Sequence, residues 1–282
     1  MPRRTLVLGG GGVTGIAWEI GLIAGLADRG LDLRSADVVI GTSAGSVVGA
    51  ALGSPMEPRA AYEEQLEPPE PQPKAVLGPW TLVRYAAALG STRDLDRGVI
   101  RLGTWAAKGS RTDPAERVAV FEAGLPSHEW PLRFDLRVTA TSTVDGRLHV
   151  FDRACDVPLP YAVAASCAVP LVWPPVVVDG VAYLDGGMRS PANVDLAQGS
   201  SAVVVIAPLV RAMRHTATPA AQLAALRLGE RGVLVAPSRT ALRAIGRNLL
   251  DPARRAASAR AGYADAALVR DRVARAWTAH RP

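Results

Sequence analysis

The chain has 282 residues, of which 49% are hydrophobic, so its composition provides for a substantial core. Its two cysteines, Cys155 and Cys167, argue against a disulfide framework or a cysteine-based metal site, and we expect neither a metal nor a cofactor. The longest apolar stretch, residues 162–178, is interrupted by prolines, and the apolar segment after Arg4 is too short for a secretion signal. We therefore expect a cytoplasmic location, with any membrane contact peripheral.

The formal net charge of +6 is unevenly distributed along the chain. Residues 211–282 hold fourteen arginines and four acidic residues, a net charge of +10, so residues 1–210 carry −4. Such a basic segment is typical of contact with an anionic membrane or a nucleic acid, but it is also typical of a solvated helical surface. We favour the solvated surface and expect no nucleic-acid partner.

Residues 5–52 are predicted to alternate between strands and helices. Residues 5–8 form an apolar strand that enters a glycine loop, and apolar residues at helical spacing over 13–29 predict a helix. A second strand over 37–40 and a buried helix over 44–52 follow. This order is typical of a parallel α/β sheet.

Residues 54–79 interrupt the alternation with seven prolines among acidic residues, which predicts an extended and poorly ordered segment. A flap over an acyl pocket and simple disorder are the two interpretations of such a segment. Helical pieces are expected within 80–122. Strands are expected over 134–140 and 147–151.

The remaining elements continue the α/β pattern. Residues 176–184 predict a hairpin, because two apolar runs flank the pair Asp179-Gly180. After it we expect a strand over 202–207, a helix over 223–228, a strand over 233–235, a helix over 237–250 and a long helix over 252–279. We interpret residues 1–282 as one domain with its core at about 5–210 and a helical extension at about 211–282.

The segment Gly41-Thr42-Ser43-Ala44-Gly45 is typical of a nucleophile elbow, a strand–turn–helix that exposes a serine hydroxyl. Its glycines allow the tight turn, and the following helix N-terminus favours developing negative charge. A serine that only caps a buried helix is the alternative.

The glycine run at residues 9–12 has two interpretations. Its backbone N–H groups are suited to holding an oxyanion. The spacing Gly10-x-Gly12-x-x-Gly15 also fits a dinucleotide fingerprint, which requires an acidic residue at the end of the second strand. Asp37 stands at the start of that strand instead, so the nucleotide interpretation is disfavoured.

The base that would activate Ser43 is not a well-placed histidine. His128, His149, His215 and His280 lack a local catalytic signature, although His215 and His280 come late enough for a Ser–acid–His order. Asp185-Gly186-Gly187 directly follows the predicted hairpin, and a carboxylate at a strand end is suited to taking a proton from a nearby hydroxyl. A plain turn is the alternative there.

The glycine loop, the elbow and the Asp-Gly-Gly block together, in this order, resemble the patatin-like phospholipase family, bacterial branch. The intervening and following sequence is similar as well, at residues 164–175, 190–197 and 250–255. The resemblance implies a three-layer α/β fold with a central, mostly parallel sheet flanked by helices. It covers most of the chain.

The resemblance also implies a catalytic dyad of Ser43 as nucleophile and Asp185 as base, without histidine. It implies an oxyanion hole from the N–H groups of Gly11 and Gly12, with Gly10 as a further candidate. The glycines that support these motifs are Gly15, Gly41, Gly45, Gly186 and Gly187.

The implied activity is hydrolysis of a lipid acyl ester through an acyl-serine intermediate, of phospholipase A or lysophospholipase type. A general carboxylesterase or thioesterase and a catalytically idle lipid-binding member are the alternatives. Many family members carry Lys or Arg where this chain has Thr14, which removes a natural partner for a lipid phosphate. Arg189 is a candidate substitute, and an ordinary surface arginine is the other interpretation of it. The expected partners are the lipid or acyl-ester substrate and, transiently, a membrane surface.

Overall fold

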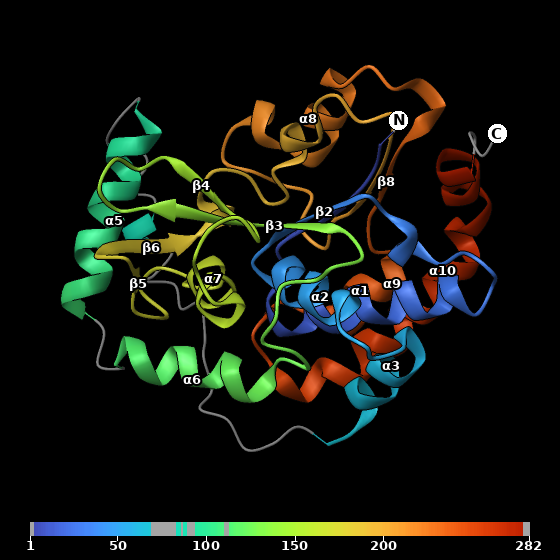
Figure 1. Ribbon diagram of the computed structural model, residues 1–282, viewed down its shortest axis with the longest axis horizontal. Helices are drawn as coiled ribbons and strands as arrows, with labels where there is room; N and C mark the ends of the chain where they lie inside the picture. Colours follow the sequence, from blue (N-terminus) through green and yellow to red (C-terminus); the bar gives the residue numbers. More distant parts are fainter. Residues whose placement is uncertain (1–2, 69–82, 86, 89–93, 110–112, 279–282) are drawn as a thin grey trace.

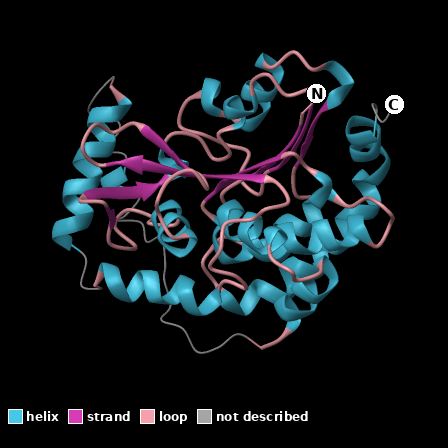
Figure 2. Cartoon of the chain, viewed as in Figure 1, coloured by secondary structure: helices cyan, strands magenta, loops and turns pink. Residues whose placement is uncertain are grey.

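A computed structural model describes residues 3–68, 83–85, 87–88, 94–109 and 113–278. Within them, eight strands form one mixed sheet with helices on both faces (Figures 1 and 2). The strands are β1 Arg4–Leu8, β2 Val38–Thr42, β3 Asp135–Ser142, β4 Leu148–Phe151, β5 Val176–Val178, β6 Val181–Asp185, β7 Ala202–Ile206 and β8 Gly232–Val235. The helices are α1 Gly12–Ala27, α2 Ala44–Gly53, α3 Pro58–Leu66, α5 Leu95–Gly109, α6 Pro114–Gly124, α7 Leu159–Ser166, α8 Pro219–Ala225, α9 Arg239–Ile245 and α10 Arg255–Thr278.

The sheet is parallel through its centre and antiparallel at one end. Its order is β5-β6-β3-β2-β1-β7-β8, and all pairs from β3 to β8 along this path are parallel. The hairpin β5–β6 and strand β4 join β3 in antiparallel fashion. The hairpin turn has positive φ at both Asp179 (49°) and Gly180 (76°), as its Asp-Gly sequence predicts. The predicted α/β fold with a mostly parallel sheet is confirmed.

One edge of β3 carries two strands end to end. Parallel β2 occupies it up to the pair Thr42–Thr139, and antiparallel β6 occupies it from the pair Asp185–Ala140 onward. Strand β4 pairs with residues on both sides of this junction, so it lies on the opposite edge of β3. Because β2 and β6 run toward each other, their carboxyl ends meet beside adjacent residues of β3.

The two faces of the sheet bury different side chains. Leu6, Leu8 and Val39 point into the core shared with α1, α2 and α10, whereas Val7 and Ile40 point to the other face, toward α8. This alternation is the period-2 geometry of strands. Figure 1 shows α8 on the opposite side of the sheet from α1, α2 and α10.

Helix α10 packs closely along α1. A Cβ atom at Gly21 would lie 2.0 Å from the Ala259 carbonyl oxygen, and one at Gly262 would lie 2.1 Å from the Trp18 carbonyl oxygen. The Trp18 indole donates a hydrogen bond to Asp265 (3.0 Å) in the same contact. The C-terminal extension thus shares the main core through backbones that meet directly.

The extended conformation predicted over residues 54–79 is wrong for residues 58–66. Residues 58–66 form α3, because Pro58 stands at the helix N-terminus, where its missing N–H costs nothing. Tyr62 of α3 stacks on Tyr263 of α10, with ring centroids 5.0 Å apart. Residues 69–79 lie outside the described residues.

Two C-terminal helices differ in extent from their predictions. Helix α8 starts earlier than residue 223, because Thr218 caps it by accepting a hydrogen bond from the Ala221 N–H (3.3 Å). Helix α9 ends at Ile245 rather than 250, because Gly246 adopts a φ of 75°.

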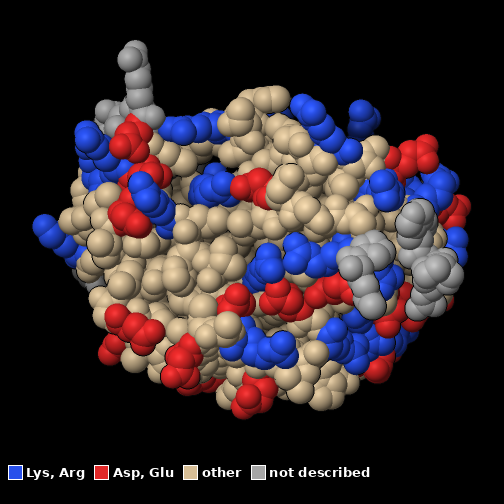
Figure 3. All heavy atoms as spheres, turned by 45° about the horizontal axis from the view of Figure 1, so that its top comes forward, with Lys and Arg blue, Asp and Glu red and all other residues tan. Residues whose placement is uncertain are grey.

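Basic and acidic side chains are interspersed over the face drawn in Figure 3. Among the described residues, no helix is both long and apolar enough to cross a membrane.

The α1–α10 contact generates a stability prediction. Gly21→Ala is expected to destabilise the fold by about 1–3 kcal/mol or more, because the new methyl group meets the backbone of α10. Gly124→Ala is the control: nothing lies within 4 Å of its Cβ position, so higher helix propensity should leave stability unchanged or raised. Urea unfolding measures both, and equal midpoints for the two variants would contradict the packing argument.

Candidate active site

Ser43 occupies a strained turn between β2 and α2. Its φ of 53° and ψ of −116° are rarely adopted by residues other than glycine. Gly45 is required because a Cβ atom there would lie 2.1 Å from the Leu8 carbonyl oxygen, and Gly41 because a Cβ would lie 2.6 Å from the Cα of Ser46. The glycines of the predicted elbow therefore serve close backbone contacts.

Two serines missed by sequence reasoning hold the turn. The Ser43 N–H donates to the Ser166 Oγ (2.9 Å) at the end of α7, and the Ser46 Oγ donates to the Ser43 carbonyl (2.6 Å). Ser166 lies in the segment 164–175 that contributed to the family resemblance, but nothing in the sequence assigned it a role. Only the packing of α7 beside α2 brings it to the elbow.

Asp185 ends β6 and lies against Ser43. Its carboxylate accepts a hydrogen bond from the Gly187 N–H (2.7 Å). Burial raises the pKa of Asp185 to about 6, and the nearby Ser43 side chain and the Gly187 N–H partly oppose this rise. A Cβ at Gly186 would lie 2.4 Å from the Thr139 Oγ1, so the glycine after the acid is required by β3.

The glycine loop runs beside Ser43. A Cβ at Gly10 would lie 3.6 Å from the Ser43 Cβ. The Gly10 N–H, however, donates to the Pro191 carbonyl (2.7 Å), so it is not available as the oxyanion donor that we considered. In the described part of the chain, the N–H groups of Gly11 and Gly12 have no protein acceptor. The loop thus offers two donors where α1 begins.

A buried carboxyl group anchors the start of this loop. Glu19 of α1 accepts a hydrogen bond from the Gly9 N–H through Oε1 (3.1 Å), while Oε2 has no partner among the described residues. Burial raises the pKa of Glu19 well above its ordinary value, which favours the neutral acid. Sequence reasoning missed Glu19. The pattern that indicates it is a single acidic residue within the otherwise uncharged helix α1.

No hydrogen bond within the described residues joins a histidine to Ser43. His128 contacts the Glu122 carbonyl (2.6 Å). His149 packs against Phe151 and Tyr183, with ring centroids 4.4 and 5.1 Å away, and burial lowers its pKa.

Of the two late histidines, His215 does not complete a triad. His215 is exposed in the short turn η4 (His215–Ala217), and His280 lies outside the described residues.

Two further side chains near the dyad were missed by sequence reasoning. Cys167 places its Sγ 3.8 Å from the Ser46 Oγ, and burial raises the pKa of its thiol to about 12. Tyr85 donates to the Pro170 carbonyl (3.1 Å), and burial together with the charge of Asp185 raises its pKa. The thiol is therefore neutral, and the phenol is held by the loop that follows α7.

The family model described as "Patatin-like phospholipase" matches residues 6–197, about two thirds of the chain. The chain belongs to the patatin-like phospholipase family. The match includes the glycine loop, the elbow and Asp185-Gly186-Gly187. No curated protein is similar enough in sequence to be matched.

Solved structures of low sequence identity resemble this patatin-like chain. VipD from Legionella pneumophila is 17% identical with a TM-score of 0.46, covering 96% of this chain and 67% of its own. The type III effector ExoU is 18% identical with a TM-score of 0.42, covering 96% of this chain and 53% of its own. ExoU of Pseudomonas aeruginosa in complex with SpcU is 15% identical with a TM-score of 0.35, covering 91% and 52%. The patatin-like chain spans about half the length of the ExoU chains.

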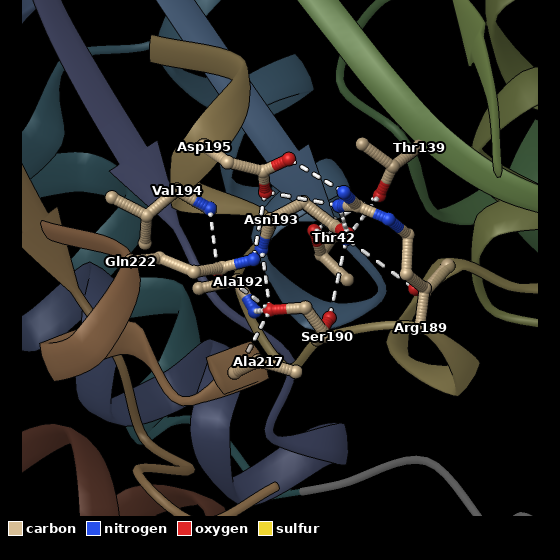
Figure 4. A network of polar contacts seen from close by, with 11 residues as sticks. Thr42, Thr139, Arg189, Ser190, Ala192, Asn193, Val194, Asp195, Ala217 and Gln222 are labelled. Carbon is tan, nitrogen blue, oxygen red and sulfur yellow. Dashed lines mark hydrogen bonds and ion pairs between the residues drawn. The ribbon is translucent and has the colours of Figure 1, made fainter. Parts of the chain in front are cut away.

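A buried amide links the two halves of the patatin-like site. The Asn193 Nδ2 lies 3.1 Å from the Thr42 Oγ1 (Figure 4) and 3.3 Å from the Gly186 carbonyl. Thr42 adjoins Ser43, and Gly186 adjoins Asp185. It also contacts the Ser190 carbonyl at 3.2 Å. Asn193 is fully buried with a φ of 49°, a conformation that asparagine tolerates better than most residues. One side chain thus connects the strand end before the nucleophile to the turn after the acid.

The two positions considered for an anion contact are otherwise engaged. Arg189 forms a two-pronged ion pair with Asp195 (2.9 and 2.5 Å) and donates to the Asn193 Oδ1 (3.0 Å), as Figure 4 shows. Thr14 is buried, and its hydroxyl donates to the Leu249 carbonyl (3.3 Å). Arg189 is therefore part of the network around Asn193, and Thr14 faces protein backbone.

The buried acid predicts a pH-dependent stability effect. Asp185 ionises at about pH 6 in the fold but at about 4 in the unfolded chain, so its charge destabilises the fold above pH 6, and this cost disappears below about pH 4. Asp185→Asn should therefore be more stable than wild type by about 1–3 kcal/mol at pH 8, with the gap closing near pH 4. Urea unfolding at both pH values tests this. Asp271→Asn, at an exposed carboxylate, should follow wild type, and a gap for Asp185→Asn that is independent of pH would contradict the argument.

The amide of Asn193 predicts a second effect. Asn193→Asp should destabilise the fold by about 1–3 kcal/mol, because a carboxylate oxygen would face the Gly186 and Ser190 carbonyls. Gln198→Glu makes the same chemical change at an exposed position and should be neutral. Thermal melting compares the two, and an unchanged melting temperature for Asn193→Asp would refute the role of the amide.

Proposed function

We propose that the chain is a lipid acyl-ester hydrolase, of phospholipase A or lysophospholipase type, that acts through a Ser43–Asp185 dyad. The observation that carries the proposal is the position of the buried Asp185 carboxylate, which lies near enough to the Ser43 side chain for Ser43 to lower its pKa, at the strained elbow of a patatin-like chain. A strained serine beside a buried carboxylate is typical of a nucleophile paired with its base.

Asp185 takes the proton as the Ser43 Oγ attacks the ester carbonyl carbon. Burial supports this role, because a pKa of about 6 makes the carboxylate a stronger base than an exposed aspartate while leaving it ionised at neutral pH. The Gly187 N–H fixes one carboxylate oxygen, which limits its rotation.

The oxyanion of the tetrahedral intermediate is held by the N–H groups of Gly11 and Gly12. Both donors stand at the N-terminus of α1, where the helix dipole adds to their effect. Gly10 contributes by position, since its hydrogen bond to Pro191 fixes the loop beside Ser43.

The reaction proceeds in two balanced halves. Collapse of the first intermediate breaks the ester bond, and protonated Asp185 returns the proton to the leaving alcohol, which leaves an acyl ester on Ser43. Water then attacks this ester with Asp185 as base, releasing the fatty acid and restoring the hydroxyl.

Removal of either dyad member tests the mechanism. Ser43→Ala and Asp185→Asn should each lower kcat/KM by about a thousandfold or more on phospholipid micelles and on a short p-nitrophenyl ester, as for other nucleophile–base units. His215→Ala is the control and should retain wild-type activity. Loss of activity in His215→Ala with retention in Asp185→Asn would overturn the dyad in favour of a triad. Specific binding of phospholipid micelles by a wild type that hydrolyses neither substrate would indicate an idle lipid-binding member, and hydrolysis of the short ester alone would indicate a general esterase.

The pKa of Asp185 predicts the pH profile. The base must be ionised, so kcat/KM should fall about tenfold per pH unit below about pH 6 and level off above it. Initial rates on the short ester between pH 4.5 and 8.5, with unfolding monitored separately, test this. A profile that is flat through pH 6 would exclude Asp185 as the group that titrates.

A further inference from the structure

A half-buried arginine that has no acidic partner among the described residues lies on α6, which packs against α7. Arg117 of α6 places its guanidinium carbon 4.1 Å from the Trp173 ring centroid and 4.6 Å from that of Phe121. Its Nε is enclosed without a hydrogen-bond partner, and no described carboxylate forms an ion pair with it. Burial lowers the pKa of Arg117, which reflects the cost of holding this charge away from water.

The position of Arg117 relates it to the nucleophile. Helix α6 packs against α7 and β5, and Figure 1 shows it alongside α7. Trp173, whose ring lies 4.1 Å from the guanidinium carbon, belongs to the loop that follows α7. In the same loop the Ala168 carbonyl accepts a hydrogen bond from the Asp185 N–H (3.0 Å), and the Cys167 Sγ lies 3.8 Å from the Ser46 Oγ. The cation is therefore packed on the loop that also contacts the turns of Ser43 and Asp185.

The loop that carries Trp173 onto the guanidinium is itself constrained. Leu171 in this loop has a φ of 63°, a strained value for a branched side chain. Two residues on, Trp173 covers one face of the guanidinium, while Phe121 contacts it from α6 itself. Aromatic contacts of this kind hold the planar fork of an arginine without using its terminal N–H donors.

The other candidates for an anion contact are occupied. Arg189 is neutralised by Asp195, and the Thr14 hydroxyl bonds to a backbone carbonyl. Of the three side chains, Arg117 alone combines a positive charge with the lack of an acidic partner in the described part of the chain.

We propose that Arg117 forms an anion subsite that receives the phosphate of the lipid while Ser43 attacks its acyl ester, an inference that rests on the proposed function. A guanidinium matches the oxygens of a phosphate with paired N–H donors, and the aromatic contacts restrict its orientation. The subsite accordingly selects phospholipids over neutral acylglycerols with the same acyl chains. Free inorganic phosphate, which offers the same oxygens, is the competing occupant.

The test compares two substrates that differ in the phosphate. Phosphatidylglycerol and diacylglycerol with identical acyl chains are presented in the same neutral detergent micelles. Arg117→Gln should lower the ratio of their kcat/KM values by about 10- to 100-fold, mainly through KM for the phospholipid. Arg117→Lys keeps the charge, so its ratio of kcat/KM values should lie between those of wild type and Arg117→Gln. Arg272→Gln, at an exposed arginine of α10, should have the wild-type ratio.

Each outcome decides the proposal. An equal loss on both substrates at unchanged melting temperature would overturn it, because Arg117 would then only support Trp173. An unchanged ratio in Arg117→Gln would also overturn it. If Arg117→Gln does not fold, the kcat/KM ratio of Arg117→Lys is compared with that of wild type. An unchanged ratio in Arg117→Lys would contradict phosphate binding through the paired N–H donors of the guanidinium.

A binding measurement separates this proposal from the proposed function. Glycerophosphoglycerol and inorganic phosphate are titrated by calorimetry into Ser43→Ala and into the double variant with Arg117→Gln. Weaker binding of the glycerophosphodiester in the double variant supports the subsite even if wild type hydrolyses no lipid. Equal binding in both proteins refutes it even if the hydrolase is active, and tighter binding of inorganic phosphate than of the diester would assign the subsite to free phosphate.

Discussion

The site depends on one constraint of the sheet, the meeting of β2 and β6 on a single edge of β3. Thr42 pairs with Thr139 and Asp185 with Ala140, so two strands far apart in sequence end beside neighbouring residues. A parallel strand and an antiparallel strand that share one edge must approach with their carboxyl ends facing. Ser43, which follows the end of β2, carries the hydroxyl, and Asp185, the last residue of β6, carries the carboxylate. The sheet brings the two together without any loop having to reach across the molecule.

The close approach at this junction is costly, and the surrounding residues offset the cost. Ser43 is held at positive φ, Asp185 is buried with a raised pKa, and Glu19 lies enclosed beneath the glycine loop. Ser166 and Asn193 compensate by satisfying the backbone and side-chain groups around the junction. Reactive geometry is thus maintained by a shell of short polar side chains, which is how strained sites generally persist in stable folds.

The arginines near the site illustrate how a partner determines what a charge does. Arg189 has its donors directed at Asp195 and Asn193, so its charge supports the network that connects the turns of Ser43 and Asp185. Arg117 lies between aromatic rings, which hold its plane, and has no acidic partner in the described part of the chain. An arginine side chain therefore stabilises a hydrogen-bond network at position 189, whereas the arginine at position 117 is the one that we propose binds a ligand.

The sequence by itself determined the local features, because these depend on neighbouring residues. The strands, the elbow around Ser43, the Asp-Gly hairpin turn and the family all followed from patterns within short segments. Only the tertiary structure decided which N–H groups of the glycine loop are free, since the partner of Gly10 is Pro191, 181 residues away. The tertiary structure also decided the conformation of α3. Its proline-rich sequence suggested an extended chain, but the stacking of Tyr62 on Tyr263 of α10 accompanies a helix there. Ser166, Asn193 and Arg117 carried no spacing signal, because their contacts are made across the fold.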